Sequence, residues 1–105
     1  RKINLADAPT GMQGERLLAA GQRLGMRIWV EDRPVAGHVT TREHETVGFA
    51  LKGHATLTLG DRRIELAPGD SWVVPAGVPH SYRIENSFAA VEATAPPPQG
   101  ETRLE

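Results

Sequence analysis

Residues 69–86, GDSWVVPAGVPHSYRIEN, decide the fold of this chain. The stretch opens with a glycine-aspartate turn and continues as a short apolar strand over residues 71–74. It then bends through PAGVP at residues 75–79, and His80 begins a second strand of alternating residues. Two prolines and a glycine within these five positions fix the backbone angles. The sequence therefore predicts that His80 is held at a defined place beside a sheet.

Outward from this stretch, short strands and turn residues alternate along the chain. Further strands are predicted at residues 15–20, 26–31 and 88–95, and residues 54–70 are predicted to form a hairpin that turns at Gly60 and Asp61. Residues 17–20 are also compatible with one helical turn. Short strands with glycine or proline every eight to twelve residues predict an all-β sandwich or barrel.

The two ends of the chain lack this pattern. Residues 1–14 mix small, polar and turn-forming residues, with a possible edge strand where Ile3 and Leu5 alternate. Residues 96–105, PPPQGETRLE, are expected to form an exposed, flexible tail. With 105 residues in total, the chain is expected to form one domain.

Composition excludes several classes of function. The net charge is −1, from 12 basic and 13 acidic residues, and no basic run predicts binding to nucleic acid or to a membrane. The absence of cysteine excludes disulfides, thiolate metal sites and cysteine nucleophiles. No apolar run approaches the roughly 18 residues needed to span a bilayer, and the first residues carry no signal-peptide pattern. A cytoplasmic protein is the expectation.

The spacing Gly69-x5-Pro75-x-Gly77-x2-His80 resembles the second conserved motif of the cupin family, which comprises small jelly-roll barrels of the RmlC-like type. The resemblance implies a single-domain cupin barrel over residues 15–95. It also implies that His80 occupies the position of a metal-binding histidine that faces the barrel interior. The alternative is a histidine that caps a strand and packs under a loop. The family asparagine, four residues after this histidine, is replaced by Ile84.

The first cupin motif is degenerate. The family pattern is a glycine, five residues, His-x-His, three or four residues, a glutamate, six residues and a glycine. Counting back from Gly53 places Thr46 at the glutamate, with Arg42 and Thr40 at the histidines. Counting forward from Gly37 gives a different alignment that also lacks the three ligands.

The residues before Thr46 alternate in a way that offers a partial replacement. An unbulged strand would place His38, Arg42 and His44 on the interior face, with Glu43 and Glu45 on the opposite face. His44 and His80 would then meet across the barrel. Two imidazoles with water would hold one divalent metal, such as zinc, iron, nickel or manganese, at reduced affinity. The alternative is a metal-free pocket in which His44 bonds to a neighbour.

The same face carries candidate ligand-binding residues. Arg42 is predicted to clamp a carboxylate or phosphate, unless it pairs with a nearby acid. Thr46, Tyr82 and Ile84 are predicted to line the cavity. Trp72 is predicted to join them, although aromatic residues at such positions more often belong to the core.

Three functions are compatible with these residues. The first is a small single-domain cupin that binds a small molecule near His80, with an incomplete or atypical metal site. The second is a divalent-metal-dependent cupin enzyme, of dioxygenase, isomerase or decarboxylase type, that uses His80 and His44. The third is a structural role with a plugged cavity. The resemblance also implies a homodimer that associates through strands near the chain ends.

Overall fold

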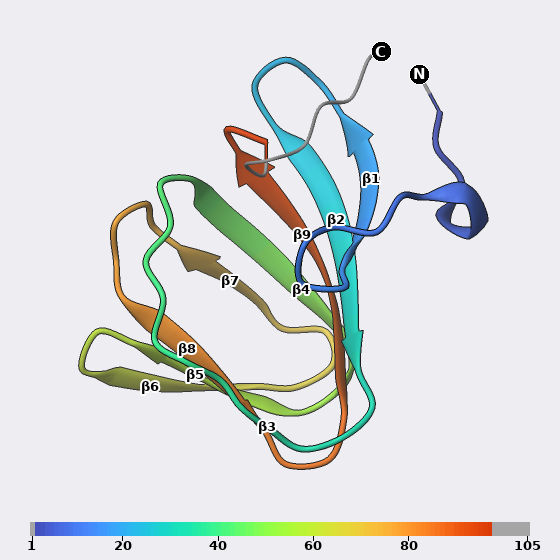
Figure 1. The fold of residues 1–105 in the computed structure, drawn as a ribbon. Coiled ribbons are helices and arrows are strands. Elements are labelled where there is room, and N and C mark those ends of the chain that lie inside the picture. Colours follow the sequence, from blue (N-terminus) through green and yellow to red (C-terminus); the bar gives the residue numbers. More distant parts are fainter. Residues whose placement is uncertain (1, 98–105) are drawn as a thin grey trace.

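The structure is a computed structural model that describes residues 2–97. Its nine strands are β1 (Arg16–Ala20), β2 (Gly25–Glu31), β3 (Val35–Ala36), β4 (Glu45–Gly53), β5 (Ala55–Leu59), β6 (Arg62–Leu66), β7 (Ser71–Val74), β8 (His80–Ile84) and β9 (Phe88–Ala95). They form two antiparallel sheets that face each other (Figure 1). One sheet has five strands in the order β1-β2-β9-β4-β7, and the other has four in the order β3-β8-β5-β6. The predicted all-β class is confirmed, and no α-helix occurs within residues 2–97.

The strands and turns predicted around His80 occur at the expected positions. The strand at residues 71–74, the corner at residues 75–79 and the strand that begins at His80 all form as expected. Residues 17–20 belong to β1, which settles the alternative between a strand and a helical turn in favour of the strand. Alternation of buried and exposed residues along β4 and β7 shows that one face of each strand points between the sheets.

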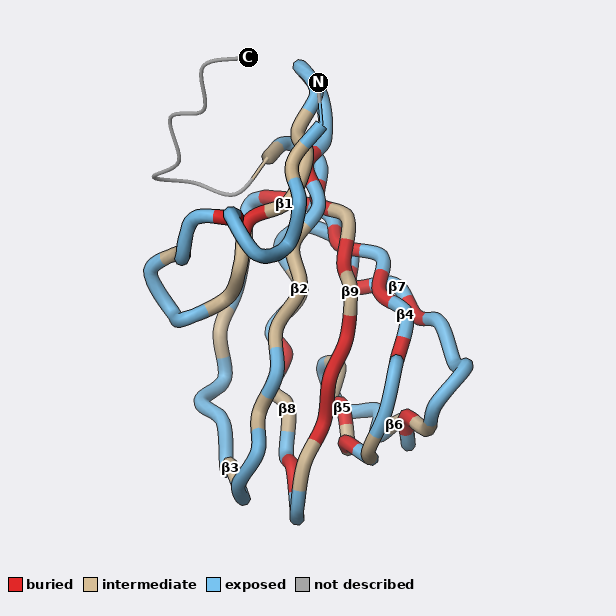
Figure 2. Tube along the Cα trace, turned by 90° about the vertical axis from the view of Figure 1, so that its right-hand side faces the viewer, coloured by how far each residue is buried: buried red, intermediate tan, exposed pale blue. Residues whose placement is uncertain are grey.

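The apolar core lies at one end of the space between the sheets. Phe88, Leu57 and Leu66 are almost fully buried there, with Ala50 and Ala90 from the central strands beside them. Figure 2 shows the buried positions concentrated along β9, the middle strand of the five-stranded sheet. Further along the same inner faces the residues become polar, with Glu92 on β9 and Thr46 on β4. The core therefore fills one end of the sandwich, and the other end carries polar groups.

The N-terminal segment differs from the expectation. Residues Leu5–Asp7 form a 3-10 helix, η1, in place of the possible edge strand through Ile3 and Leu5. The side chain of Asn4 accepts a hydrogen bond of 2.9 Å from the backbone amide of Ala6, which stabilises this turn. Of the expected tail at residues 96–105, residues 98–105 lie outside the described residues.

The segment before β4 also differs from the expectation of one continuous strand. Residues 37–44 contain only an isolated bridge, at Thr40, and the regular strand begins at Glu45. Thr40 exchanges backbone hydrogen bonds of 2.8 and 2.9 Å with His80. The segment is therefore attached to β8 of the opposite sheet at this point, which ties the start of β4 to the strand that carries His80.

No helix within residues 2–97 has the length and apolar character needed to cross a membrane. The cytoplasmic location stays a prediction.

Candidate functional site

A cavity of about 420 Å³ opens between the two sheets at their polar end. Its apolar walls are formed by Trp29, Val35, Val74, Tyr82 and Ile84. Its polar lining includes Arg27, Arg42, Thr46, His80 and Glu92. The cavity therefore combines an apolar wall with a few convergent polar groups, as small-molecule sites do.

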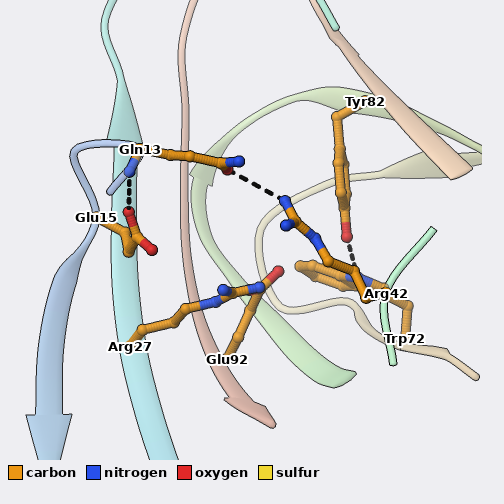
Figure 3. A network of polar contacts seen from close by, with 7 residues as sticks. All are labelled: Gln13, Glu15, Arg27, Arg42, Trp72, Tyr82 and Glu92. Carbon is orange, nitrogen blue, oxygen red and sulfur yellow. Dashed lines mark hydrogen bonds and ion pairs between the residues drawn. The ribbon is translucent and has the colours of Figure 1, made fainter. Parts of the chain in front are cut away.

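An ion pair lies on the five-stranded side of the cavity. Arg27 on β2 and Glu92 on β9 are cross-strand partners, and Arg27 Nε lies 2.7 Å from a Glu92 carboxylate oxygen (Figure 3). Their side chains are only 14 % and 3 % exposed. Pairing offsets the cost of burying each charge. The guanidinium of Arg27 is thus already neutralised by the protein.

Sequence reasoning missed this pair. The available signal was Glu92, the one charged residue within the strand FAAVEATA. Period-two alternation places Glu92 on the same face as the core residues Phe88 and Ala90. A carboxylate at such a position needs a partner, although its identity depends on which strand pairs with β9.

The second cavity arginine has a different environment. Arg42 Nη2 donates a hydrogen bond of 3.2 Å to the side-chain oxygen of Gln13, which is a neutral group. Glu43 and Glu45, its candidate partners in the sequence, are both exposed, and within residues 2–97 no ion pair involves Arg42. Figure 3 shows this guanidinium close to Gln13 on the N-terminal loop. Arg42 therefore lines the cavity with its charge not neutralised by a bonded acid.

The two candidate histidines are both buried, but only His80 lines the cavity. His80 Nδ1 lies 3.0 Å from the backbone oxygen of Val78. Because that oxygen only accepts hydrogen bonds, the contact favours, among the two neutral tautomers, the one that has its proton on Nδ1 and its lone pair on Nε2. His44 Nδ1 is buried without a hydrogen-bond partner among the described residues.

The surroundings of His44 favour its neutral form. Burial lowers the pKa of His44, and the positive charges of Arg27 and Arg42 lower it further. The charge of Glu92 acts in the opposite direction, and His80 adds a small lowering effect. His44 is therefore a neutral imidazole at pH 7.

This lowered pKa makes stability depend on pH. The unfolded chain binds a proton at His44 near its ordinary pKa of 6.5, whereas the folded chain does not until the pH is lower. Stability from this group is therefore complete above pH 6.5 and lost as the pH falls below it. We expect His44→Asn to flatten the pH dependence of the urea midpoint between pH 8 and pH 5. An unchanged profile would contradict a lowered pKa.

The donor set does not fit the three-ligand metal site that the family pattern implies. Among residues 2–97, no three histidine, aspartate or glutamate side chains come together as a candidate metal group. Glu43 and Glu45 are exposed and do not supply the missing carboxylate. His38 lines the cavity but is also exposed. His80 and His44 remain a partial pair of nitrogen donors.

The other predicted binding residues divide into two groups. Arg42, Thr46, Tyr82 and Ile84 line the cavity, as does His80, whereas Trp72 is buried in the core behind it. Trp72 donates its indole proton to the Tyr82 oxygen at 3.1 Å. Burial raises the pKa of Tyr82, and the charge of Glu92 raises it further. Tyr82 therefore stays a protonated phenol, and its own proton remains available to a ligand.

Comparison with known proteins identifies the family. Residues 28–93 match the cupin domain. Over 84 residues the chain is 30% identical to quercetin 2,3-dioxygenase from Bacillus subtilis, covering 75% of this chain but 25% of that protein. The chain thus spans about a quarter of the length of this relative.

Solved structures agree with the jelly-roll fold. An RmlC-like cupin from Shewanella frigidimarina has a TM-score of 0.81 at 18% identity, over 91% of this chain and 90% of that one. KdgF from Halomonas has a TM-score of 0.77 at 22% identity, over 93% and 94% of the two chains. At these identities the likeness concerns the fold alone.

Proposed function

The chain belongs to the cupin family, and we propose that it binds a small organic acid in the cavity between its sheets, beside His80. The observation that carries this proposal is the contrast between the two cavity arginines. Arg27 is bonded to the carboxylate of Glu92, whereas the guanidinium of Arg42 donates a hydrogen bond to the neutral side chain of Gln13. A guanidinium without an acid partner is well suited to a carboxylate or phosphate, which it binds through two parallel hydrogen bonds.

The cavity supports a ligand of small-molecule size. Its volume of about 420 Å³ lies within the range of roughly 300–1,000 Å³ for ligand pockets. Glu15 and Glu31 also line it, so the position of Arg42 rather than a net positive charge supports an acid. The Glu15 carboxylate already has a partner, because it accepts a hydrogen bond of 2.9 Å from the backbone amide of Gln13.

The walls suggest how the rest of the ligand is held. Trp29 and Ile84 offer apolar surface to a hydrocarbon or ring portion. The Tyr82 hydroxyl and the Thr46 side chain offer hydrogen bonds further in. The proposed ligand is therefore an acid with an apolar body and a hydrogen-bonding group, held by Arg42 at one end.

Quenching of tryptophan fluorescence tests this proposal, because Trp29 lines the cavity. We expect one or more members of a panel of small carboxylates and phosphates to bind. Arg42→Gln should weaken that binding roughly tenfold or more, since hydrogen bonds to charged groups contribute about 1.5–3 kcal/mol. Arg42→Lys should retain part of the affinity.

The matched control is Arg83→Gln, which removes an exposed arginine whose partner is the surface acid Glu85. This variant should bind as the parent does. Equal affinity of Arg42→Gln and the parent, or no binding of any acid by the parent, would contradict the proposal.

A second candidate is a divalent-metal-dependent enzyme of dioxygenase, isomerase or decarboxylase type, with His80 and His44 as metal ligands. The observation in its favour is that His80 keeps a lone pair on Nε2 and that His44 is neutral. The likeness to a dioxygenase motivates the reaction class. The missing third ligand weighs against it, since two imidazoles hold a metal weakly.

Metal analysis of protein purified without an affinity tag separates the two candidates. Near-stoichiometric zinc, iron, nickel or manganese in the parent, lost from a His80→Ala, His44→Ala double variant, would support the enzyme. Metal absent from both proteins after incubation with each salt would contradict it and leave the acid-binding proposal in place.

A further inference from the structure

A loop from the N-terminal segment reaches the cavity and contributes to its wall. Residues 9–15, which we call the N-terminal loop, precede β1, and two of their side chains, Gln13 and Glu15, line the cavity. The part of the chain that matches the cupin domain begins only at residue 28. The N-terminal loop is therefore a feature of this chain that the match to the family does not describe.

Hydrogen bonds of the backbone hold the N-terminal loop in place. The amide of Leu17 donates to the carbonyl oxygen of Pro9 at 2.8 Å, and the amide of Gly11 donates to that of Glu15 at 2.6 Å. Leu17, directly after the loop, is completely buried and anchors it to the core. The position of Gln13 at the cavity is thus set by the fold of the loop itself.

The loop keeps its own acid on its backbone. Glu15 Oε1 accepts a hydrogen bond of 2.9 Å from the backbone amide of Gln13. A Cβ at Gly11 would clash with this carboxylate, so the glycine leaves the space that the carboxylate occupies. Figure 3 shows Glu15 bonded to the loop while the side chain of Gln13 extends toward Arg42. The guanidinium therefore receives a neutral amide from this loop.

The hydrogen bond to Arg42 fixes which way the carboxamide of Gln13 faces. Arg42 Nη2 lies 3.2 Å from Gln13 Oε1. Because a guanidinium only donates hydrogen bonds, the amide oxygen must face it, and the NH2 group occupies the other branch of the carboxamide. Among residues 2–97, no group accepts a hydrogen bond from this NH2 group. Gln13 thus places a further unused donor beside the charge of Arg42.

We propose that Gln13 determines the specificity of the cavity for acids, an inference that rests on the acid-binding function proposed above. Its amide oxygen positions the guanidinium of Arg42 without neutralising it, and its NH2 group donates a second hydrogen bond to the same carboxylate or phosphate. A carboxylate of the same shape at this position would instead pair with Arg42, as Glu92 pairs with Arg27. The difference between an amide and an acid at residue 13 therefore decides whether a ligand acid can bind.

Carbon-13 NMR titration of Gln13→Glu tests this geometry without a ligand. The carboxyl group introduced there should have a lower pKa than the one introduced by Gln22→Glu, because the positive charge of Arg42 stabilises its ionised form. Gln22 is a matched control, since it is exposed in the turn between β1 and β2 and does not line the cavity. Equal pKa values would overturn the proposal.

Calorimetry with matched pairs of an acid and its primary amide tests the specificity. The pairs are acetate with acetamide, benzoate with benzamide, and phenylacetate with phenylacetamide. The parent should prefer the acid, and Gln13→Glu should lower this preference roughly tenfold or more, because Arg42 is then neutralised and a like charge faces the ligand. Gln13→Met keeps the charge of Arg42 and should weaken acid binding only several-fold, since it removes one donor. Gln22→Glu should bind as the parent does.

The outcomes separate this inference from the acid-binding proposal. If Gln13→Glu keeps the preference of the parent while Arg42→Gln loses it, this inference is overturned and the acid-binding proposal stands. A Gln13→Met protein that loses the preference as completely as Gln13→Glu would also overturn it, because the loop would then act through its shape. A parent that binds no acid more tightly than its amide would overturn both. Circular dichroism checks that every variant remains folded.

Discussion

Replacing Glu92 by glutamine should lower the free energy of unfolding by about 3 kcal/mol, the scale of a broken buried ion pair. The glutamate side chain is 3 % exposed, and it is the ion-pair partner of Arg27, which is 14 % exposed. Glutamine keeps the shape but removes the charge, so the guanidinium remains in the interior without its counter-charge. Urea unfolding monitored by circular dichroism at pH 7 measures the loss.

The chain supplies its own control for this experiment. Arg83 and Glu85 form an ion pair of nearly the same length, 2.9 Å, but their side chains are 64 % and 72 % exposed. Glu85→Gln should therefore change stability by less than about 0.5 kcal/mol, because exposed pairs contribute little. An equal effect at both sites would show that water in the cavity solvates Arg27 fully.

A double variant separates the charge from the packing. Replacing Arg27 and Glu92 together by methionine should recover most of the stability lost in Glu92→Gln, since no uncompensated charge then remains. A double variant less stable than the single one would indicate that the two side chains act through their contacts with other groups.

The ion pair of Arg27 and Glu92 is an example of a contact that the sequence alone does not predict. Strand positions and the setting of His80 follow from local period and from turn residues, which need no knowledge of distant contacts. The partner of Glu92 lies 65 residues away, and only the pairing of β2 with β9 identifies it. Alternation alone could therefore place Glu92 on the inner face without naming Arg27.

The segment before β4 shows a second limit. Alternation predicted one strand from His38 to Thr46, but residues 37–44 lack regular pairing and are held by backbone bonds between Thr40 and His80. The inward positions of Arg42 and Thr46 nevertheless follow the predicted alternation. His44 is buried as an inward residue would be, yet it does not line the cavity, because that depends on which neighbours cover it.

Gly53→Ala should cost about 4 kcal/mol of stability, because two separate effects combine at this residue. Gly53 ends β4, where the chain crosses to the other sheet, and its φ of +78° lies in the left-handed region that disfavours side chains. A Cβ there would also clash with the backbone oxygen of Ser87. That oxygen accepts a hydrogen bond from the His54 amide at 3.1 Å, so it cannot move freely.

Gly60→Ala isolates the first effect from the second. Gly60 has a φ of +63°, but a Cβ there would meet no atom within 4 Å. This variant should lose only about 1 kcal/mol, the cost of the backbone conformation alone. The difference between the two variants in free energy of unfolding, measured in urea, then gives the cost of the clash with Ser87. Ser87 lies in the turn before β9 and bonds to the residue that follows β4. Equal losses of stability would mean that the turn containing Ser87 shifts to accept the Cβ. The close approach at Gly53 would then not determine how the chain passes from one sheet to the other.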